Sequence, residues 1–300
     1  MKTILTLDVG GTAVKMGLIR EDGSLQSKRE RSVSFDGYRT PILHTVIREA
    51  EAYLQEEDAS PAGIGVSATG QVDDREGVVI GTNGAIPGYE GTPFRRALEE
   101  RFGVPVRVQN DANAAVLGEC YAGRGRDVAD VLMVTLGTGV GGGVVSGGRL
   151  MTGARGIAGE LGHFQLDPGG EKCTCGRRGC FERYASVSAL VRSAGGKRGY
   201  ANGREIFSRA AEDDPTALGL LSDWIGFIAA GLIGLTHIFN PSLILIGGGV
   251  STQEQLLIAP LREKVMAGVM PRFAEGLRLE AAMLGNDAGI YGAAALFLRP

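Results

Sequence analysis

Short apolar runs separated by polar, glycine-containing turns dominate the first third of the chain. Residues 3–19 contain two such runs joined by the turn DVGGT, a pattern that predicts a strand, a tight turn and a second strand. A third strand is predicted over SLQSKRERSV, and a helix over about 40–56. The remaining segments are predicted as a buried strand at AGIGVSATG, a loop at VVIGTNGAIPGYEG, a helix at TPFRRALEERF and a strand at VPVRVQN.

The second half of the chain repeats this arrangement. The strand VADVLMVTL leads through a glycine turn at 137–143 into the strand VVSGGRL. The later segments are predicted as a strand at LILIGGGVS, a helix near 254–269, a strand at LRLEAAML and a last helix after Asn286-Asp287. The sequence therefore predicts two α/β halves built from related units, with a cleft between them and a boundary near residues 110–120.

One long apolar stretch raises the question of a membrane span. Residues 224–253 contain no Lys, Arg, Asp or Glu. Asn240-Pro241 divides the stretch into a helical half and a strand half. A span needs about 20 consecutive apolar residues, and neither half is expected to reach that length. We therefore expect a buried helix that leads into a buried strand, and no membrane partner.

Charge and glycine content narrow the classes of function. The chain has 31 Lys and Arg residues against 34 Asp and Glu residues, so its net charge of −3 argues against electrostatic binding to nucleic acid. The first apolar run is too short for a signal peptide, which makes the cytoplasm the expected compartment. Glycine is in excess, at 48 of 300 residues, but it shows no collagen period. The glycines must therefore be interpreted by position.

Two glycine turns are candidates for phosphate binding. The first, Gly10-Gly11-Thr12, follows Asp8, and the second begins at Gly137-Thr138-Gly139. Glycine lacks a Cβ and allows positive φ, so the backbone N–H groups of such turns can converge on a phosphate. Each turn alone is also compatible with a tight hairpin, because a strand follows the second turn where a dinucleotide-binding motif would have a helix. Two matching turns favour a phosphate clamp between two lobes.

A cysteine cluster predicts a metal site. His163, Cys173, Cys175 and Cys180 have the spacing H-x9-C-x-C-x4-C, and these three cysteines are among only four in the chain. Zn²⁺ binds Cys₃His sets in closed tetrahedral sites, so the predicted zinc is structural. Disulfides are not expected, because three clustered thiols cannot all pair and the compartment is expected to be reducing. The alternative is a cluster of unligated thiols.

Acidic side chains near these motifs suggest a site for a polyhydroxylated ligand. Asp111 follows a predicted strand at the start of a helix, where it could cap the helix or point into the predicted cleft. Glu160, His163 and Glu182 flank the cysteine loop, so a metal would bring them together. Either glutamate could instead be a solvated surface charge.

Several segments together resemble the ROK family, which combines bacterial sugar kinases with sugar-responsive repressors: DVGGT, QNDANAA, TLGTGVGGG, GELGH, CTCGRRGCFE and LILIGGGVS. The resemblance extends from about residue 3 to 297. It implies an α/β fold of the actin-like ATPase (ribonuclease H-like) class, with two lobes and a cleft between them. We expect a small lobe at 1–111 plus about 287–300, and a large lobe at 112–286 that carries the zinc-binding loop 163–180.

The resemblance also implies roles for individual residues. Asp111 matches the catalytic base, Mg²⁺ accompanies ATP, and His163 would serve zinc through one ring nitrogen and the sugar through the other. A homodimer is implied by resemblance alone. The positions that match sugar contacts are Asn110, Asp111, Glu160, His163 and Glu182. The positions that match the nucleotide loops are Asp8, Gly10, Gly11, Thr12, Gly137, Thr138, Gly139, Gly141 and Gly248.

Two segments depart from the family pattern and bear on the substrate. Ala85-Ile86-Pro87-Gly88-Tyr89 aligns with a sugar-contacting Asn-Leu-Pro-Gly-Trp segment, and Asn83 is the candidate for the missing amide. Ala68-Thr69-Gly70-Gln71 replaces an Ala-Pro-Gly turn, which is similar to the β-glucoside kinases of the family. Those kinases tend to lack the zinc cysteines that this chain keeps.

The resulting hypothesis is an ATP-dependent hexose kinase that phosphorylates the 6-hydroxyl of glucose or a related hexose. Alternatives within the family are kinases of N-acetylmannosamine, N-acetylglucosamine or β-glucosides. A sugar-responsive transcriptional regulator is disfavoured, because family repressors carry a helix-turn-helix domain ahead of the first phosphate loop and only seven residues precede Asp8 here. A nucleotide-dependent enzyme with a non-sugar substrate is the remaining alternative.

Overall fold

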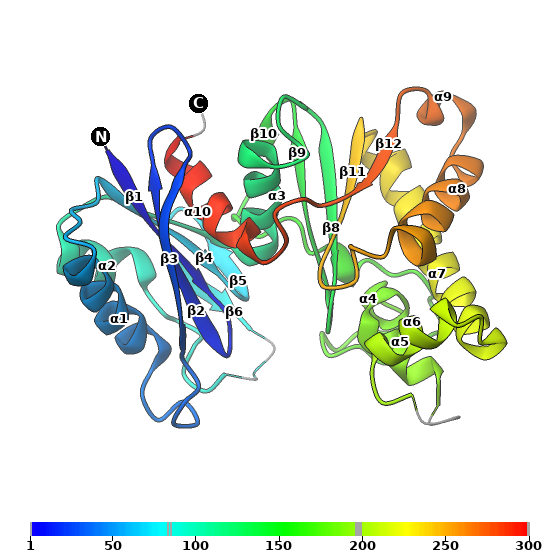
Figure 1. Cartoon of the computed structure of the whole chain (residues 1–300), viewed down its shortest axis with the longest axis horizontal. Helices are drawn as coiled ribbons and strands as arrows, with labels where there is room; N and C mark the ends of the chain where they lie inside the picture. Colours follow the sequence, from blue (N-terminus) through cyan, green and yellow to red (C-terminus); the bar gives the residue numbers. More distant parts are fainter. Residues whose placement is uncertain (1, 83, 85, 196–199, 299–300) are drawn as a thin grey trace. The chain divides into compact units, whose positions relative to one another are not determined.

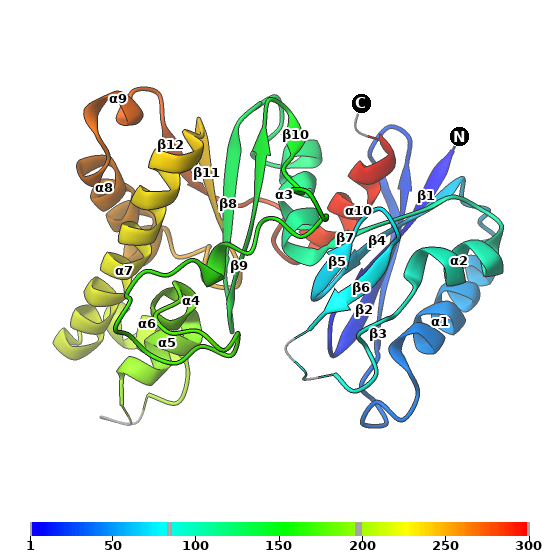
Figure 2. The ribbon, with the colours of Figure 1, turned by 180° about the vertical axis from the view of Figure 1, so that it is seen from behind.

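The chain forms two compact units of similar α/β construction. The computed structural model describes residues 2–82, 84, 86–195 and 200–298 (Figures 1 and 2). The first unit comprises the chain up to Arg126, the segment Leu150–Ala158 and the chain from Asn286 onward. The second comprises Asp127–Arg149 and Gly159–Gly285.

A five-stranded mixed sheet forms the centre of the first unit. Strands β1 and β2 are the predicted strand–turn–strand pair and are antiparallel, and β3 extends the same edge. Strands β1, β4 and β7 are mutually parallel, so their carboxyl ends lie side by side at one edge of the sheet. In sheet order the strands are β3 (Leu25–Ser32), β2 (Ala13–Arg20), β1 (Thr3–Val9), β4 (Gly63–Ala68) and β7 (Val106–Asn110).

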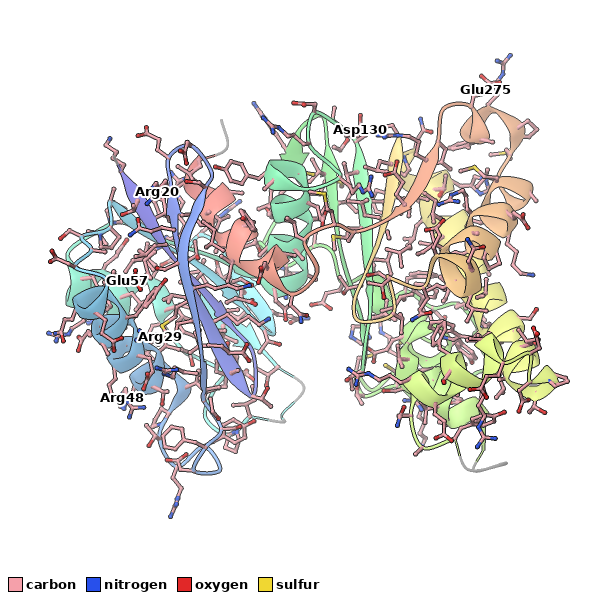
Figure 3. All side chains as sticks on the ribbon, viewed as in Figure 1. Arg20, Arg29, Arg48, Glu57, Asp130 and Glu275 are labelled. Carbon is pink, nitrogen blue, oxygen red and sulfur yellow. The ribbon has the colours of Figure 1, made fainter. Side chains whose placement is uncertain are left out.

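Helices cover both faces of this sheet. The larger core lies under α1 (Ile42–Glu56) and α2 (Phe94–Phe102), where alternate residues of the central strands are fully buried. On the other face α10 (Ala288–Leu298) packs on β1 and β4 beside α3 (Asp111–Ala122). Charged side chains such as Arg48 of α1 point outward (Figure 3). Both faces of the parallel strands are thus buried, as their continuous apolar character requires.

A small hairpin in the first unit was not predicted. Strands β5 (Gln71–Asp73) and β6 (Val78–Gly81) pair antiparallel, where we expected only loop after β4. Arg95 of α2 donates to the backbone carbonyl of Asp74 at 2.7 Å and so fastens the hairpin to that helix. The polar sequence between the two short strands gave no periodic signal.

The second unit has its own five-stranded sheet. The predicted strands form here, but β9 starts at Val140 rather than at Val144, so Gly141–Gly143 are strand residues and not part of the turn. Strands β8 and β11 are parallel, and β8 and β9 are antiparallel. In sheet order the strands are β10 (Arg149–Leu150), β9 (Val140–Ser146), β8 (Val131–Leu136), β11 (Leu243–Gly247) and β12 (Arg278–Ala281).

Helices pack against this second sheet around one large core. The helix predicted near 254–269 begins as a π-helical turn at Glu254–Ile258 and continues as an α-helix. The short helices α4, α5 and α6 had no prediction. The α-helices of this unit are α4 (Glu182–Ala185), α5 (Val187–Ser193), α6 (Gly203–Ala211), α7 (Pro215–Phe239), α8 (Ala259–Gly268) and α9 (Pro271–Ala274), with 3₁₀ turns at Leu161–His163 and Gly285–Asp287.

Helix α7 is longer than the sequence indicated. Among the described residues it is the one helix long and apolar enough to cross a membrane, with a mean hydropathy of 1.8 over 18 residues. The helical half of 224–253 is therefore only the later part of a longer helix that begins at Pro215. Its inward stripe, which includes Leu221, Trp224, Ile228 and Leu232, is buried in the second core. The buried stripe is what a core helix of this unit requires.

Helix α3 belongs to the first unit, whereas we expected the second lobe to begin at residue 112. The physical reason is its close packing against α10, in which glycines remove the side chains between the two helices. A Cβ at Gly118 would overlap the carbonyl oxygen of Ala288, and one at Gly292 would overlap that of Ala114. Backbone therefore lies directly against backbone at this crossing.

Replacing Gly292 with Ala should destabilise the first unit. The added methyl has only backbone to displace, so we expect a loss of about 1–3 kcal/mol in the free energy of unfolding, the usual cost of overpacking. Urea denaturation followed by circular dichroism measures it. The control is Gly226→Ala in α7, where an added methyl meets nothing within 4 Å. That change should stabilise by about 0.8–1 kcal/mol, and equal effects of the two substitutions would contradict the packing described.

Candidate functional site

The first glycine turn lines a pocket in the first unit. Gly10 donates its backbone N–H to the carbonyl of Ala13 at 2.9 Å, which closes the turn between β1 and β2. The turn therefore presents backbone at the carboxyl end of a parallel strand, the usual place for ligands in α/β sheets. A pocket of about 320 Å³ lies there, lined by Asp8, Gly10, Thr12, Ala13, Lys15, Glu30 and Asn286.

Asp8 is held in this pocket by neighbouring strands. Ser67 of β4 donates to its Oδ1 at 2.7 Å, and Lys15 of β2 lies 3.5 Å from its Oδ2. Both partners sit opposite Asp8 in the strand register. Gly289 of α10 leaves room for the carboxylate, since a Cβ there would collide with it. The pocket thus has a fixed carboxylate beside an ammonium group.

Lys15 was missed by the sequence reasoning. Its Nζ also donates to the backbone carbonyl of Asn286 at 3.1 Å, which places a positive charge just before the first residue of α10. A signal was present, because Lys15 is the one charged residue within the apolar stretch VKMGLI. A lone charge in a buried strand usually has a partner.

Asn110 and Asp111 lie at the same edge of the sheet, where β7 ends and α3 begins. Asn110, and not Asp111, is the N-cap: its Oδ1 accepts the backbone N–H groups of Ala112 and Asn113 at 2.9 and 3.1 Å. Its Nδ2 donates to the carbonyl of Gly70 at 2.8 Å. Asp111 occupies the first helical position, where its Oδ1 accepts from Ala112 N at 2.8 Å. The first turn of α3 therefore holds this carboxylate in place.

The second glycine turn is shorter than predicted. It consists of Gly137–Gly139, with Gly137 donating to the carbonyl of Gly139 at 3.0 Å, and it leaves Thr138 exposed. Gly141 lies in β9, contrary to the expected turn over 137–143. Gly248 follows the parallel strand β11 with a φ of +91°, and its backbone lies against the carbonyl of Leu136. The two glycine segments therefore meet at the carboxyl ends of β8 and β11.

The side-chain carboxylate of Glu182 is bound to the backbone beside this turn. Its Oε2 accepts the N–H of Val140 at 3.0 Å, and a Cβ at Gly139 would overlap the same oxygen. Glu182 follows Cys180 by two residues, so the cysteine loop and the glycine turn are linked directly. The surface-charge alternative for Glu182 is therefore wrong, because the carboxylate has a defined structural partner.

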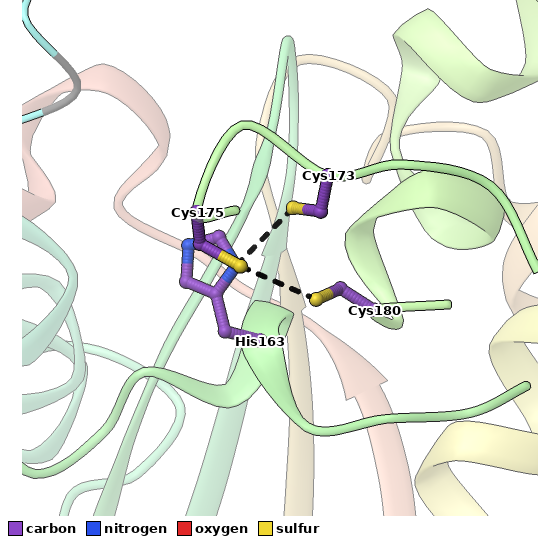
Figure 4. A group of neighbouring side chains, drawn as sticks. All are labelled: His163, Cys173, Cys175 and Cys180. Carbon is purple, nitrogen blue, oxygen red and sulfur yellow. Dashed lines mark hydrogen bonds between the residues drawn. The ribbon is translucent and has the colours of Figure 1, made fainter. Parts of the chain in front are cut away.

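The four predicted metal ligands converge (Figure 4). The nitrogen and sulfur atoms of His163, Cys173, Cys175 and Cys180 all lie within 4.8 Å of one another. Cys175 Sγ is 3.5 Å from Cys180 Sγ, and Cys173 Sγ is 3.6 Å from His163 Nδ1. A tetrahedral zinc site with Zn–S bonds near 2.3 Å places its sulfurs about 3.8 Å apart. The donor set and its spacing therefore fit Zn²⁺.

His163 also approaches a second group. Its Nε2 is 4.0 Å from Oε2 of Glu160, while Nδ1 faces the cysteines. The 3₁₀ turn Leu161–His163 brings these two side chains together. Glu160 remains half-exposed, with 43% of its side chain accessible, so it is free to contact a ligand.

The protonation of the thiols depends on their burial. Burial raises the pKa of the Cys180 thiol to about 12, and the neighbouring Cys175 and Cys173 add to this rise. A hydrogen bond from the backbone N–H of Arg177 lowers the pKa of Cys175. Without a metal the Cys180 thiol is therefore protonated at neutral pH, and metal binding must release its proton.

The predicted site residues are distributed over the two units. The first unit contains Asp8, Gly10, Gly11, Thr12, Asn110 and Asp111; the second contains Gly137, Thr138, Gly139, Gly141, Gly248, Glu160, His163 and Glu182. Asn83 lies outside the described residues.

Comparison with known proteins agrees with these motifs. The sequence pattern of the ROK family matches residues 4–299. A glucokinase of Thermotoga maritima is 36% identical over 98% of this chain and 96% of its own length. An N-acetylmannosamine kinase of Shigella flexneri is 35% identical over 98% of each chain.

The fold agrees as well. The solved structure of a ROK family glucokinase from Streptomyces griseus, in complex with glucose and AMPPNP, matches with a TM-score of 0.80 and 32% identity over 98% of each chain. The predicted α/β fold of the actin-like ATPase class is thereby confirmed.

The bond from Glu182 to the second glycine turn should contribute to stability. Glu182→Ala leaves the Val140 N–H without its acceptor, and we expect a loss of about 1–3 kcal/mol in the free energy of unfolding. Glu182→Gln keeps an acceptor oxygen and should lose less. Thermal unfolding measures both changes.

The control is Glu275→Ala, whose carboxylate makes an exposed pair with Arg272. Its removal should alter the free energy of unfolding by less than about 1 kcal/mol. A Glu182→Ala protein as stable as this control would show that the bond has no structural importance.

Proposed function

Because this chain belongs to the ROK family, we propose that it is an ATP-dependent hexose kinase that transfers the γ-phosphoryl group to the 6-hydroxyl of glucose or a related hexose. The observation that carries the proposal lies within the first unit. There the turn Gly10-Gly11-Thr12 and the carboxylate of Asp111 follow parallel strands and occupy the same sheet edge. A phosphate turn and a proton acceptor at one edge are what phosphoryl transfer to an alcohol needs.

In this proposal Asp111 is the general base. Its carboxylate would accept the proton of the attacking hydroxyl, and the first turn of α3 holds it in place. The side chain of Asn110 is fixed by its bonds to the backbone of Ala112 and Gly70. Asn110 precedes the proposed base directly, and its Nδ2 donates to Oδ1 of Asp111 at 2.9 Å. The other proposed sugar contacts are Asn83, Glu160, His163 and Glu182.

The nucleotide would be held mainly by backbone groups. The proposed ATP contacts are Asp8, Gly10, Gly11, Thr12, Gly137, Thr138, Gly139, Gly141 and Gly248. Lys15 supplies a positive charge beside the first turn, which suits a phosphate. Mg²⁺ prefers carboxylate oxygens and phosphates as ligands, and Asp8, which with Glu30 is one of the two carboxylates that line the pocket, would hold it. Bound Mg²⁺ would neutralise charge on the transferred phosphoryl group.

We propose that the cysteine cluster binds a structural Zn²⁺. His163, Cys173, Cys175 and Cys180 fill all four positions of a tetrahedral site, so none remains for substrate. The loop is also fastened without metal, because Tyr184 donates to Asp167 at 3.0 Å. Zinc would fix the Nδ1 side of His163 and leave Nε2 directed towards Glu160. Free thiols in this number fit a cytoplasmic location.

The acceptor sugar has a second candidate. The N-acetylmannosamine kinase relative is as similar to this chain as the glucokinase relative, at 35% against 36% identity. N-acetylmannosamine, N-acetylglucosamine and β-glucosides are therefore tested beside glucose in one coupled assay of ADP release. We further propose a homodimer without nucleic-acid or membrane partners, in keeping with the net charge of −3.

Replacing Asp111 with Asn should abolish sugar-dependent ADP release. The amide keeps the oxygen that accepts from Ala112 but cannot take a proton, so we expect kcat to fall by about 10²–10⁴-fold. The fold and the metal content should be unchanged. The control is Asp58→Asn, an exposed left-handed position that Asn tolerates. Undiminished turnover in the Asp111 variant would refute the assignment of the base.

Zinc should be present and needed for stability. We expect about one zinc per chain by elemental analysis, and a lower melting temperature after chelation or in Cys175→Ser. Zinc affinity should rise with pH, because metal binding displaces the proton that Cys180 holds with its raised pKa. Cys120→Ala, outside the cluster, should retain the metal. If the protein contained no metal and chelators did not change its melting temperature, the zinc proposal would be wrong. The cysteines would then be a cluster of unligated thiols.

A further inference from the structure

Tyr89 has a buried hydroxyl that the proposed mechanism does not use. The residue is 2% exposed and lies in the core of the first unit beside Phe94, with ring centroids 6.2 Å apart. Its hydroxyl has no hydrogen-bond partner among the described residues. A buried hydroxyl without a partner costs about 1–3 kcal/mol, so such groups in folded proteins usually meet a ligand or an ordered water.

The backbone around Tyr89 fixes the position of this hydroxyl. The N–H of Tyr89 donates to Ile86 O at 3.4 Å, and the carbonyl of Tyr89 accepts the hydroxyl of Thr92 at 2.5 Å. Ile86 in turn packs over Gly11, where an added Cβ would come within 3.3 Å of its side chain. The turn that carries Tyr89 is thus built onto the first phosphate turn.

The negative charge of Asp111 acts on the same phenol. Burial raises the pKa of the Tyr89 hydroxyl, and the negative charge of Asp111 raises it further. The phenol therefore stays protonated throughout the neutral range and is a permanent hydrogen-bond donor. A donor that has no partner among the described residues, and on which the charge of the proposed base acts, is suited to a hydroxyl group of a ligand.

We propose that the Tyr89 hydroxyl binds a non-reacting hydroxyl of the acceptor sugar and so helps to determine which sugar is accepted. This inference rests on the proposed kinase function. It assigns a role to a hydroxyl particular to this chain, because Tyr89 aligns with the Trp of the family segment Asn-Leu-Pro-Gly-Trp, and Trp has no hydroxyl. A site built to hydrogen-bond a hydroxyl rejects analogues that lack it, because the buried group is then left without a partner.

The test is Tyr89→Phe, which removes one oxygen and keeps the ring in its packing. In the absence of sugar the variant should melt at the wild-type temperature or up to about 3 °C above it, since an unpaired buried group has been removed. The KM for the sugar should rise about five- to tenfold with kcat within about twofold, as for a lost contact that ground state and transition state share.

Tyr53→Phe is the matched control. The Tyr53 ring is 1% exposed in the same unit, but its hydroxyl is paired with Ser27 Oγ at 2.7 Å. Loss of that bond should lower the melting temperature by about 2–4 °C and leave the KM for sugar unchanged. A Tyr89→Phe protein that behaved like this control would show that the Tyr89 hydroxyl has a structural partner, and would overturn the proposal.

Assays of wild type and Tyr89→Phe use glucose, N-acetylmannosamine and the monodeoxy derivatives of whichever sugar the wild type phosphorylates. For the derivative that lacks the contacted hydroxyl, the two proteins should have equal KM. A penalty that is the same for every derivative would overturn a direct contact. If the wild type released no ADP with any sugar, the kinase proposal itself would fail, and this inference with it. A working wild type with an unchanged KM in Tyr89→Phe would defeat the Tyr89 proposal alone.

Discussion

The packing of α10 against the first sheet and α3 is the contact on which the proposed site depends. Three glycines at this contact remove the side chains that would hold the backbones apart: Gly65 faces Ala293, Gly118 faces Ala288 and Gly292 faces Ala114. The close approach sets the position of α3, and therefore of the carboxylate at its first residue. A fourth glycine, Gly289, makes room for Asp8 at the start of the same helix. Helix α10, near the end of the chain, thus helps to position Asp8 of β1 and Asp111 of α3.

In the second unit the corresponding role belongs to the cysteine loop. Its four potential metal ligands are separated by up to seventeen residues, and their convergence brings Glu160 beside His163 and Glu182 onto the second glycine turn. A single carboxylate therefore connects the loop to the turn. If zinc is bound as proposed, a metal that takes no part in chemistry still influences two proposed ligand-binding segments, because both are attached to the loop it closes.

The strands and long helices could be predicted because their apolar periodicity is simple, but local packing decided the details. Gly142 suggested a turn, yet it lies in β9, where glycine is needed because any Cβ at this position would collide with Leu161. Asn110 and Asp111 are both capping residues, and only the bonds to Ala112 and Asn113 show which one caps. Motif spacing indicated the metal ligands, whereas Lys15 belongs to no motif and Tyr89 departs from the Trp of the family segment with which it aligns. Their significance comes from neighbours far away in sequence.

The chain passes between the two units several times, and this has a consequence for how the protein is made. The first unit includes Leu150–Ala158 and the chain from Asn286 onward, whereas nearly all of the second unit is encoded between these segments. A ribosome that has finished the second unit has therefore not yet supplied α10, on which the first core and its close helix crossing depend. Domains tend to fold as they emerge, N-terminal first. Here the order is reversed: the unit that begins the chain is the last to be completed.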